Sequence, residues 1–320
     1  MLTVTRECNL RCSYCPTAKD GWPSLSALDA EAAVDLFVRR FGGGDIKLFG
    51  GEPLLVPQVV RAAMEAARVR PEVRRVYLST NGLGLDDEWL DYLRAYPKGV
   101  LTISMDGLPD DHRRLRRALP QAGDSYDHVV GLLPKLRAVP RVVVTQTIAP
   151  ATAKRAHQNF RHLRDLGFWR FNFLPGYYIP WKEEQLVQLR AAFDAIASDV
   201  RGTWADGGSL YVRNLFTYVP TTFFNSGLVV DSDRTIHPSN VGLSGALEGL
   251  LEQTRLGSLD DPPTPEALAE KGAEVNALLE RALPAGVMEA TRRADHELSR
   301  FCRGLYPSYL TQRASKRRVA

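Results

Sequence analysis

Apolar residues follow two alternating patterns along roughly the first two hundred residues of the chain. Short continuous runs of aliphatic and β-branched residues predict buried strands, and most are followed by a segment whose apolar residues recur at helical spacing. In the segment 29–41, Ala33, Phe37 and Phe41 fall on one side of a helix, and three glycines then end it. The pattern therefore predicts strands and helices in alternation.

The predicted elements form about six strand-then-helix units. The strands are 2–5, 46–49, 75–79, 100–104, 142–148 and 168–174. The helices are 29–41, 57–68, 86–96, 126–139, 152–166 and 182–198. This order predicts an α/β fold with a parallel sheet and right-handed crossovers. Six units rather than eight predict a partial (β/α)6, TIM-like barrel, with functional side chains at the carboxyl ends of its strands.

The pattern changes past roughly residue 205, where glycines and prolines interrupt short apolar pieces. Two further helices are predicted near 265–282 and 285–300. We expect a barrel domain over residues 1–205 and a small α+β region over residues 206–320.

Composition narrows the class of protein. The chain has 320 residues, of which 44% are hydrophobic, so it can bury a full core. Its net charge of +4 is mild, and we expect no nucleic-acid partner. It has no apolar run of about 18 residues, so we expect no membrane span. We also expect no signal peptide at the start of the chain and no disulfide framework among its four cysteines. We therefore expect a cytoplasmic protein.

Three of the four cysteines, Cys8, Cys12 and Cys15, fall within eight residues directly after the first predicted strand. Thiolates this close together are soft ligands for iron–sulfur clusters or zinc. Zinc would require a fourth Cys or His nearby, and the nearest histidine in sequence is His112. Three ligands leave one metal position open for a substrate or cofactor.

A second motif, Gly50-Gly51-Glu52-Pro53, stands where the second predicted strand ends. Glycines permit close backbone approach to a ligand, and a carboxylate beside them can accept a hydrogen bond from an ammonium group. A tight turn is the alternative reading of these residues when they are taken alone.

Together, the CxxxCxxC spacing, the aromatic Tyr14 before the last cysteine and the GGE segment resemble the signature of radical S-adenosylmethionine (SAM) enzymes. The resemblance implies that Cys8, Cys12 and Cys15 hold three irons of one 4Fe–4S cluster, whose fourth iron chelates SAM. It also implies that Glu52, with Gly50 and Gly51, binds the SAM amino group. Tyr14 is expected to place its backbone near adenine.

Segments at later strand ends resemble one branch of that family, the sulfatase maturases and peptide-modifying enzymes with SPASM domains. These segments are 78–82, with Thr-Asn-Gly, and 103–107, which is followed by His112 and Arg116. The resemblance implies that Ser104 forms a hydrogen bond with the ribose of SAM. It also implies that Arg116 binds the carboxylate of SAM and that Leu174 packs on its adenine. A plain turn at 81–82, a solvated face for Arg116 and core packing for Leu174 are the alternatives.

The segment 228–239 resembles the start of a SPASM or twitch domain, but Ser239 stands where the family has a cysteine. Cys302 is the remaining cysteine of the region, and one thiol cannot hold an auxiliary cluster. Cys302 is either a buried packing residue or the donor of a hydrogen atom to a substrate radical. Asp231 and His237 either transfer protons or serve the fold.

The resemblance implies reductive cleavage of SAM to a 5′-deoxyadenosyl radical, with an electron from a donor such as flavodoxin or ferredoxin. The radical would abstract a hydrogen atom from a ribosomally made peptide, leading to a cross-link, an epimerisation or a rearrangement. A small-molecule substrate, such as a sugar or an amino-acid-derived metabolite, is the alternative. A non-catalytic protein that keeps the cluster for binding or electron transfer is a third possibility.

Overall fold

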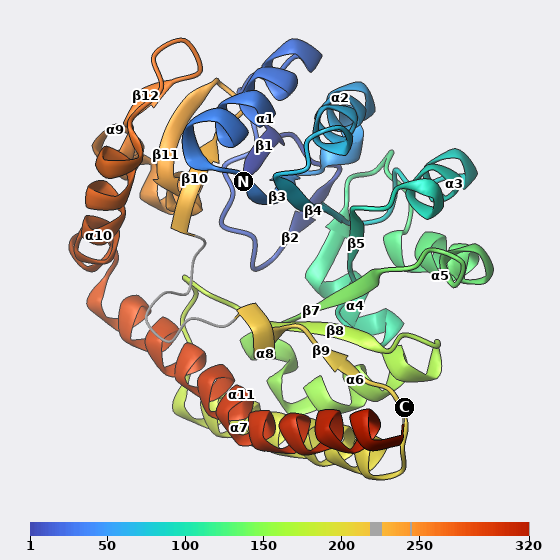
Figure 1. Ribbon diagram of the computed structural model, residues 1–320. Coiled ribbons are helices and arrows are strands. Elements are labelled where there is room, and N and C mark those ends of the chain that lie inside the picture. The colour runs from blue at the N-terminus through green and yellow to red at the C-terminus, as the bar shows by residue number, and fades with distance from the viewer. Residues whose placement is uncertain (218–225, 244, 320) are drawn as a thin grey trace. The chain divides into compact units, whose positions relative to one another are not determined.

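The computed structural model describes residues 1–217, 226–243 and 245–319, and the chain divides into two compact units (Figure 1). The first unit comprises Met1–Ile103, Arg116–Val142 and Phe224–Pro284. The second comprises Ser104–Leu115, Val143–Phe223 and Ala285–Ala320. These units differ from the two expected regions, residues 1–205 and 206–320, because each unit combines segments from both. The expected boundary near residue 205 stays a prediction.

Parallel strands form the centre of the first unit. They are β1 (Leu2–Thr5), β3 (Gly44–Gly50), β4 (Val73–Thr80) and β5 (Gly99–Ser104). Their register places four buried leucines side by side across the sheet: Leu2, Leu48, Leu78 and Leu101. Apolar side chains aligned across neighbouring strands stabilise the sheet, so this row fixes the register that the strand ends share.

The sheet of the first unit continues beyond β1. Strand β10 (Ser226–Val230) lies parallel to β1, β11 (Thr235–Ser239) is antiparallel to β10, and β12 (Gly257–Ser258) pairs with β11. Residues of the C-terminal region therefore extend the barrel sheet directly.

Helices α1 (Ala27–Phe41), α2 (Pro57–Arg68) and α3 (Asp87–Ala95) lie along one side of these strands (Figure 1). The unit also contains α5 (Ser125–Leu136), α9 (Leu251–Thr254) and α10 (Pro265–Ala282), and three short 3₁₀ segments at 53–55, 240–243 and 245–250. Helix α1 begins at a capping box between Ser26 and Asp29 and ends at Gly42, whose φ of 76° suits glycine.

The second unit contains the parallel strands β7 (Val142–Ile148), β8 (Arg170–Pro175) and β9 (Tyr211–Val212). Its helices are α4 (Pro109–Leu115), α6 (Ala156–Asp165), α7 (Glu183–Ala205), α8 (Asn214–Thr217) and α11 (Ala285–Val319), with a 3₁₀ turn at Pro150–Arg155. Helices α7 and α11 run side by side (Figure 1). An aromatic cluster fills the core of this unit: Phe160, Phe171, Phe173, Phe193 and Phe301.

The predicted strand–helix alternation is confirmed, and so is the partial α/β barrel. Three helix predictions differ in extent. The helix predicted at 285–300 continues to Val319, and the one predicted at 182–198 continues to Ala205. The segment 152–166 begins as a 3₁₀ turn before α6.

A two-stranded ribbon that the apolar pattern does not predict pairs β2 (Leu10–Cys12) with β6 (Arg116–Ala118). Strands of three residues are too short to show a period, so the sequence pattern does not reveal them. The ribbon places Arg116 opposite Cys12 and leaves it only 8% exposed, so the expected alternative of a solvated Arg116 is wrong.

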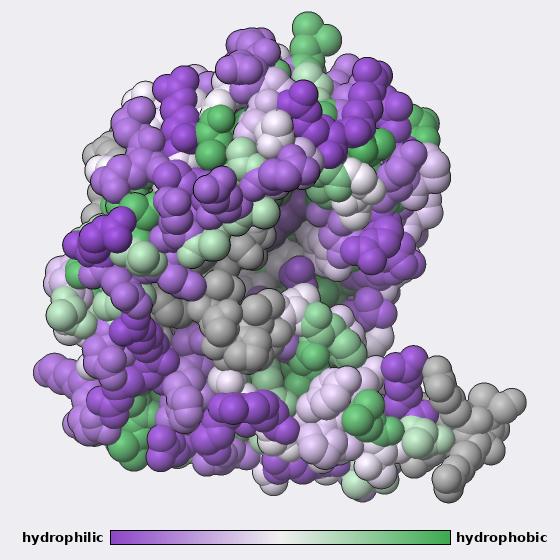
Figure 2. Space-filling model, turned by 60° about the vertical axis from the view of Figure 1, so that its left-hand side comes forward, coloured by the Kyte–Doolittle hydropathy of each residue, from purple (hydrophilic) through white to green (hydrophobic). Residues whose placement is uncertain are grey.

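Hydrophilic side chains cover most of the face shown in Figure 2, where hydrophobic residues occur in small separate groups. Among the described residues, no helix is both long and apolar enough to cross a membrane.

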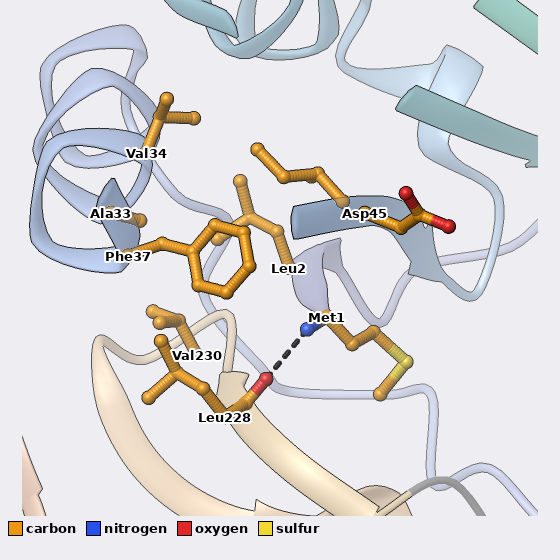
Figure 3. A pocket seen from close by; sticks show the side chains of 9 residues that line it. Met1, Leu2, Ala33, Val34, Phe37, Asp45, Leu228 and Val230 are labelled. Atoms are coloured by element: carbon orange, nitrogen blue, oxygen red, sulfur yellow. Dashed lines mark hydrogen bonds between the residues drawn. The ribbon is translucent and has the colours of Figure 1, made fainter. Parts of the chain in front are cut away.

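A small cavity lies between α1, β1, β3 and β10 in the first unit (Figure 3). Its lining is mostly apolar and includes Leu2, Val34, Phe37 and Val230, and its volume is about 30 Å³. That volume admits about one water molecule. The cavity is therefore a packing gap in the core and has no room for a nucleotide.

Candidate active site

The cysteine loop leaves the carboxyl end of β1 and is shaped by the β2–β6 ribbon. Cys8 precedes β2, Cys12 ends it, and a turn closed by the Cys15 amide on the Cys12 carbonyl (3.1 Å) follows. All three cysteines are free thiols. The loop thus lies at the strand end where the barrel architecture predicts function.

Each thiol of the loop has a different hydrogen-bond donor. The Leu10 amide donates to Cys8 Sγ (3.4 Å), Arg116 Nη1 to Cys12 Sγ (3.9 Å) and Lys19 Nζ to Cys15 Sγ (3.1 Å). Burial raises the pKa of the Cys8 thiol. Burial acts in the same direction on Cys15, but the charge and hydrogen bond of Lys19 outweigh it and lower the pKa of that thiol.

These residues fit an iron–sulfur cluster by their chemistry. Three thiols on one loop supply soft ligands, and N–H donors to the sulfurs are a usual feature of such sites. In the described part of the chain, no three His, Cys, Asp or Glu side chains are already gathered as a metal site.

The two glycines of the GGE segment allow β3 to lie against the chain before Cys8. A Cβ on Gly50 would stand 1.9 Å from the Thr5 carbonyl oxygen, and one on Gly51 would stand 2.2 Å from the Arg6 carbonyl oxygen. The Gly51 amide donates to Thr5 O (2.9 Å) and the Glu52 amide to Glu7 O (2.8 Å). The glycines thus join the two sequence motifs, and their contact with a cofactor stays a prediction.

Glu52 carries a buried carboxylate that three protein donors hold in place. Its Oε1 accepts hydrogen bonds from the Leu54 amide (3.0 Å) and the Thr80 hydroxyl (2.7 Å), and its Oε2 accepts one from the Asn81 amide (2.7 Å). Burial raises the pKa of Glu52, while these donors and the charge of Arg116 oppose that rise. A fixed, desolvated carboxylate of this kind suits an ammonium ligand.

Asn81 connects the end of β4 with the cysteine loop. Its Nδ2 donates to Asn9 Oδ1 at 2.7 Å, and its own Oδ1 accepts from the Leu83 amide (3.0 Å). The Thr-Asn-Gly segment is therefore both a turn and part of the site. Thr80, Asn81 and Asn9 are site residues that were not predicted from the sequence; the signal for Thr80 and Asn81 is their position at a predicted strand end.

Arg116 lies between several groups of the site. Its guanidinium carbon is 5.4 Å from the centroid of the Tyr14 ring, and its Nη1 contacts Cys12 Sγ. Tyr14 itself is half-buried. The site therefore combines one buried carboxylate, one largely buried guanidinium and three thiols within the first unit.

A buried ion pair between Arg6 and Asp231 fixes the chain between β1 and the cysteine loop. Arg6 is fully buried; its Nε donates to Asp231 Oδ1 (3.2 Å), its Nη2 pairs with Asp231 Oδ2, and its guanidinium stacks 3.5 Å from the Trp22 ring centroid. Asp231 is the first residue after β10. Since this carboxylate is occupied by Arg6, the geometry favours the structural alternative for Asp231.

His237 is likewise held by protein groups. Its two ring nitrogens contact the hydroxyls of Thr235 (2.9 Å) and Thr254 (3.1 Å). Burial lowers the pKa of His237, against the opposing charges of Asp231 and Asp233. These contacts favour the structural alternative for His237 as well.

Two of the expected SAM-binding residues, Ser104 and Leu174, belong to the second unit. Ser104 ends β5 and is half-buried. Leu174 lies on β8 between the buried Phe173 and Pro175, so by strand alternation it faces away from the aromatic core. That orientation disfavours core packing as the role of Leu174, and the expected SAM contacts of both residues stay predictions.

Cys302 lies on α11 and is 5% exposed. Burial, together with the nearby charge of Asp295, raises its pKa to about 12. The side chain is therefore a protonated thiol at neutral pH, which excludes it as a thiolate nucleophile and leaves the S–H bond intact.

Comparison with known proteins identifies the family. The sequence profile of the Radical SAM superfamily matches residues 2–189. GTP 3′,8-cyclase of Parasynechococcus marenigrum (strain WH8102) is 33% identical over 133 residues, which cover 39% of this chain and 38% of that protein. GTP 3′,8-cyclase 1 of Mycobacterium tuberculosis (strain ATCC 25618 / H37Rv) is 31% identical over 173 residues, which cover 52% of this chain and 45% of that protein. The match thus spans less than half of the length of these relatives.

Solved structures share the fold at low sequence identity. Native anSMEcpe with bound AdoMet and Cp18Cys peptide has a TM-score of 0.72 and 16% identity, covering all of this chain and 98% of the other. Streptococcus suis SuiB bound to precursor peptide SuiA has a TM-score of 0.59 and 13% identity, and the match covers 81% of this chain and 62% of SuiB. At these identities the likeness establishes the fold.

Proposed function

The chain belongs to the Radical SAM superfamily and uses a 4Fe–4S cluster and SAM, and from that premise we propose that it modifies a ribosomally made peptide. One observation carries the proposal. The fold corresponds over the whole chain, including residues 206–320, to an enzyme whose crystals contain a peptide. The GTP cyclases match over 133 and 173 residues only.

We assign the three loop thiols, Cys8, Cys12 and Cys15, as the cluster ligands. With SAM and a one-electron reductant, a cluster held by these thiols would supply the chemistry that removes a hydrogen atom from the substrate. The protein groups position the reactants and exclude water from them.

The residues around Glu52 prepare the SAM site. Thr80 and Asn81 orient the carboxylate of Glu52 toward the ammonium group of SAM by occupying its other lone pairs. Arg116, a largely buried cation that also contacts Cys12 Sγ, suits the SAM carboxylate. The assignment extends to Gly50, Gly51 and Tyr14 beside the cofactor, with Ser104 for the ribose and Leu174 for adenine.

The fate of the substrate radical depends on what can return a hydrogen atom. Ser239 replaces the expected cysteine, so the proposal includes no auxiliary cluster that accepts an electron. The protonated Cys302 thiol can donate its hydrogen atom to a substrate radical, which completes an epimerisation and leaves a thiyl radical. An electron from the reductant and a proton then restore the thiol.

The test is anaerobic incubation of the cluster-loaded chain with SAM, dithionite and a candidate precursor peptide in D₂O, read by mass spectrometry. Loss of two hydrogens on the peptide indicates a cross-link, and gain of one deuterium indicates epimerisation. Cys12→Ala is the inactive control. Cys302→Ala should remove deuterium incorporation while SAM cleavage continues. Deoxyadenosine formation with an unchanged peptide would overturn the peptide proposal.

A small-molecule substrate is the second candidate, and the sequence relatives favour it. Proteins that are 31–34% identical over part of the chain are named for a reaction of GTP. The same incubation with GTP in place of the peptide tests this candidate. A GTP-derived product that requires Cys12, with no change in any peptide, would establish it.

A further inference from the structure

Lys19 lies in the loop that follows Cys15 and contributes a largely buried positive charge. Its side chain donates from Nζ to Cys15 Sγ at 3.1 Å and contacts the Thr17 carbonyl oxygen at 3.5 Å. The residue is 9% exposed. Among the three thiols of the loop, Cys15 therefore has the closest cation.

The counter-charge of this lysine is not a carboxylate. Within the described residues, its contacts are those with Cys15 and Thr17, and it forms no ion pair with an acidic side chain. A buried ammonium without an opposite charge is costly, because it loses its hydration. The groups that can supply the opposite charge here are the thiolates of the cysteine loop.

The other two thiols have weaker or neutral donors. Cys8 accepts from a backbone amide, which carries no net charge. Arg116 stands 3.9 Å from Cys12 Sγ, and its charge also acts on Glu52. Lys19 is therefore the cation with the shortest contact to a sulfur of the loop, and its charge also acts on Cys8.

Reduction of a cluster on these thiolates adds one negative charge to the site. A fixed positive charge close to a ligand sulfur stabilises the reduced form more than the oxidised form, and hydrogen bonds to sulfur act in the same direction. We infer that Lys19 raises the reduction potential of the cluster bound at Cys15 and so eases its reduction by the electron donor. The inference depends on the family's cluster and not on the substrate.

The test is an anaerobic redox titration of the reconstituted full-length chain, followed by electron paramagnetic resonance of the reduced cluster. Lys19→Gln keeps a donor of similar length but removes the charge, and Lys19→Arg keeps the charge. The matched control is Lys135→Gln, which removes one lysine charge from the exposed surface of α5. Iron and sulfide are counted for every variant.

We expect the midpoint potential to become more negative in Lys19→Gln and to stay at the wild-type value in Lys135→Gln. In Lys19→Arg it should stay close to wild type. An unchanged potential in a fully loaded Lys19→Gln protein would overturn the inference. The inference would also be overturned if neither Lys19→Gln nor Lys19→Met bound a cluster. That result would mean that Lys19 is needed to hold the loop in place.

Discussion

Asn81 donates from its side chain to Asn9 at 2.7 Å, while its backbone amide donates to Glu52 at the same distance. One residue thus joins the loop between the first two cysteines to the buried carboxylate of the GGE segment. The cysteine loop and the carboxylate are held in fixed relation before any ligand binds. This preorganisation reduces the cost of ordering the site when the cluster and SAM arrive.

The Asn9–Asn81 bond predicts a measurable coupling between the two positions. Asn9→Ala should lower the free energy of unfolding by about 1 kcal/mol, the usual worth of a hydrogen bond, and Asn81→Ala should lower it by more, because it also removes the acceptor of the Leu83 amide. The double variant should cost less than the sum of the two single variants, because the Asn9–Asn81 bond can be lost only once. Urea unfolding of the reduced, metal-free chain measures the cycle, and strict additivity would show that the contact contributes nothing.

The carboxylate of Glu52 predicts the pH dependence of SAM affinity. Because burial raises its pKa above 4.5, acidification through that raised pKa neutralises the group and should weaken SAM binding. Glu52→Gln should bind SAM at least about tenfold more weakly, equivalent to about 1.4 kcal/mol, and lose this pH dependence. Equilibrium dialysis with cluster-loaded protein gives the affinities.

Glu88→Gln, which changes an exposed glutamate on α3, is the control for Glu52→Gln. Equal SAM affinity in Glu52→Gln and Glu88→Gln would rule out the assigned role of Glu52.

The Arg6–Asp231 pair predicts a large stability loss on removal of one partner. Asp231→Asn should lower the free energy of unfolding by about 3–5 kcal/mol, because it leaves the Arg6 charge buried without its counter-charge. Asp260→Asn removes the carboxylate of an exposed pair with Arg234 and should cost far less. Chemical denaturation of both variants compares them; similar losses would show that burial of the pair is unimportant.

His237 predicts a fall of stability in acid. Its folded-state pKa is lowered from 6.5, so below that pH the unfolded chain takes up a proton that the folded chain does not. The free energy of unfolding should therefore decrease as the pH falls through 6.5 and level off below the lowered pKa. His237→Gln should lose that component in denaturation curves recorded across this range. A pH profile identical to wild type would contradict the assignment.

The sequence predicts the elements with a clear period and the residues at their ends. The apolar run 142–148 appears as β7 with the same bounds, and the cysteine and GGE motifs stand at the ends of β1 and β3. The contacts between distant segments could not be predicted. Asn9 and Asn81 are 72 residues apart, and Arg6 and Asp231 are 225 residues apart. Such polar pairs depend on strand order and register, which no local pattern encodes.

The environment of Arg116 also could not be predicted from the sequence around it. In the sequence it belongs to a basic cluster, whose usual place is the solvated surface. The short ribbon β2–β6 instead turns it toward Cys12. Its environment follows from pairing with a segment more than a hundred residues away, so the composition of its own neighbourhood was misleading.

The central claim is that the Cys8, Cys12 and Cys15 loop and Glu52 form one SAM-cleaving site. The most direct measurement is the yield of 5′-deoxyadenosine from anaerobically reconstituted chain incubated with SAM and dithionite. We predict formation of deoxyadenosine by the wild type, none by Cys12→Ala, and a strong reduction in Glu52→Gln that still contains its cluster. A fully loaded wild-type protein that binds SAM but forms no deoxyadenosine would contradict the account.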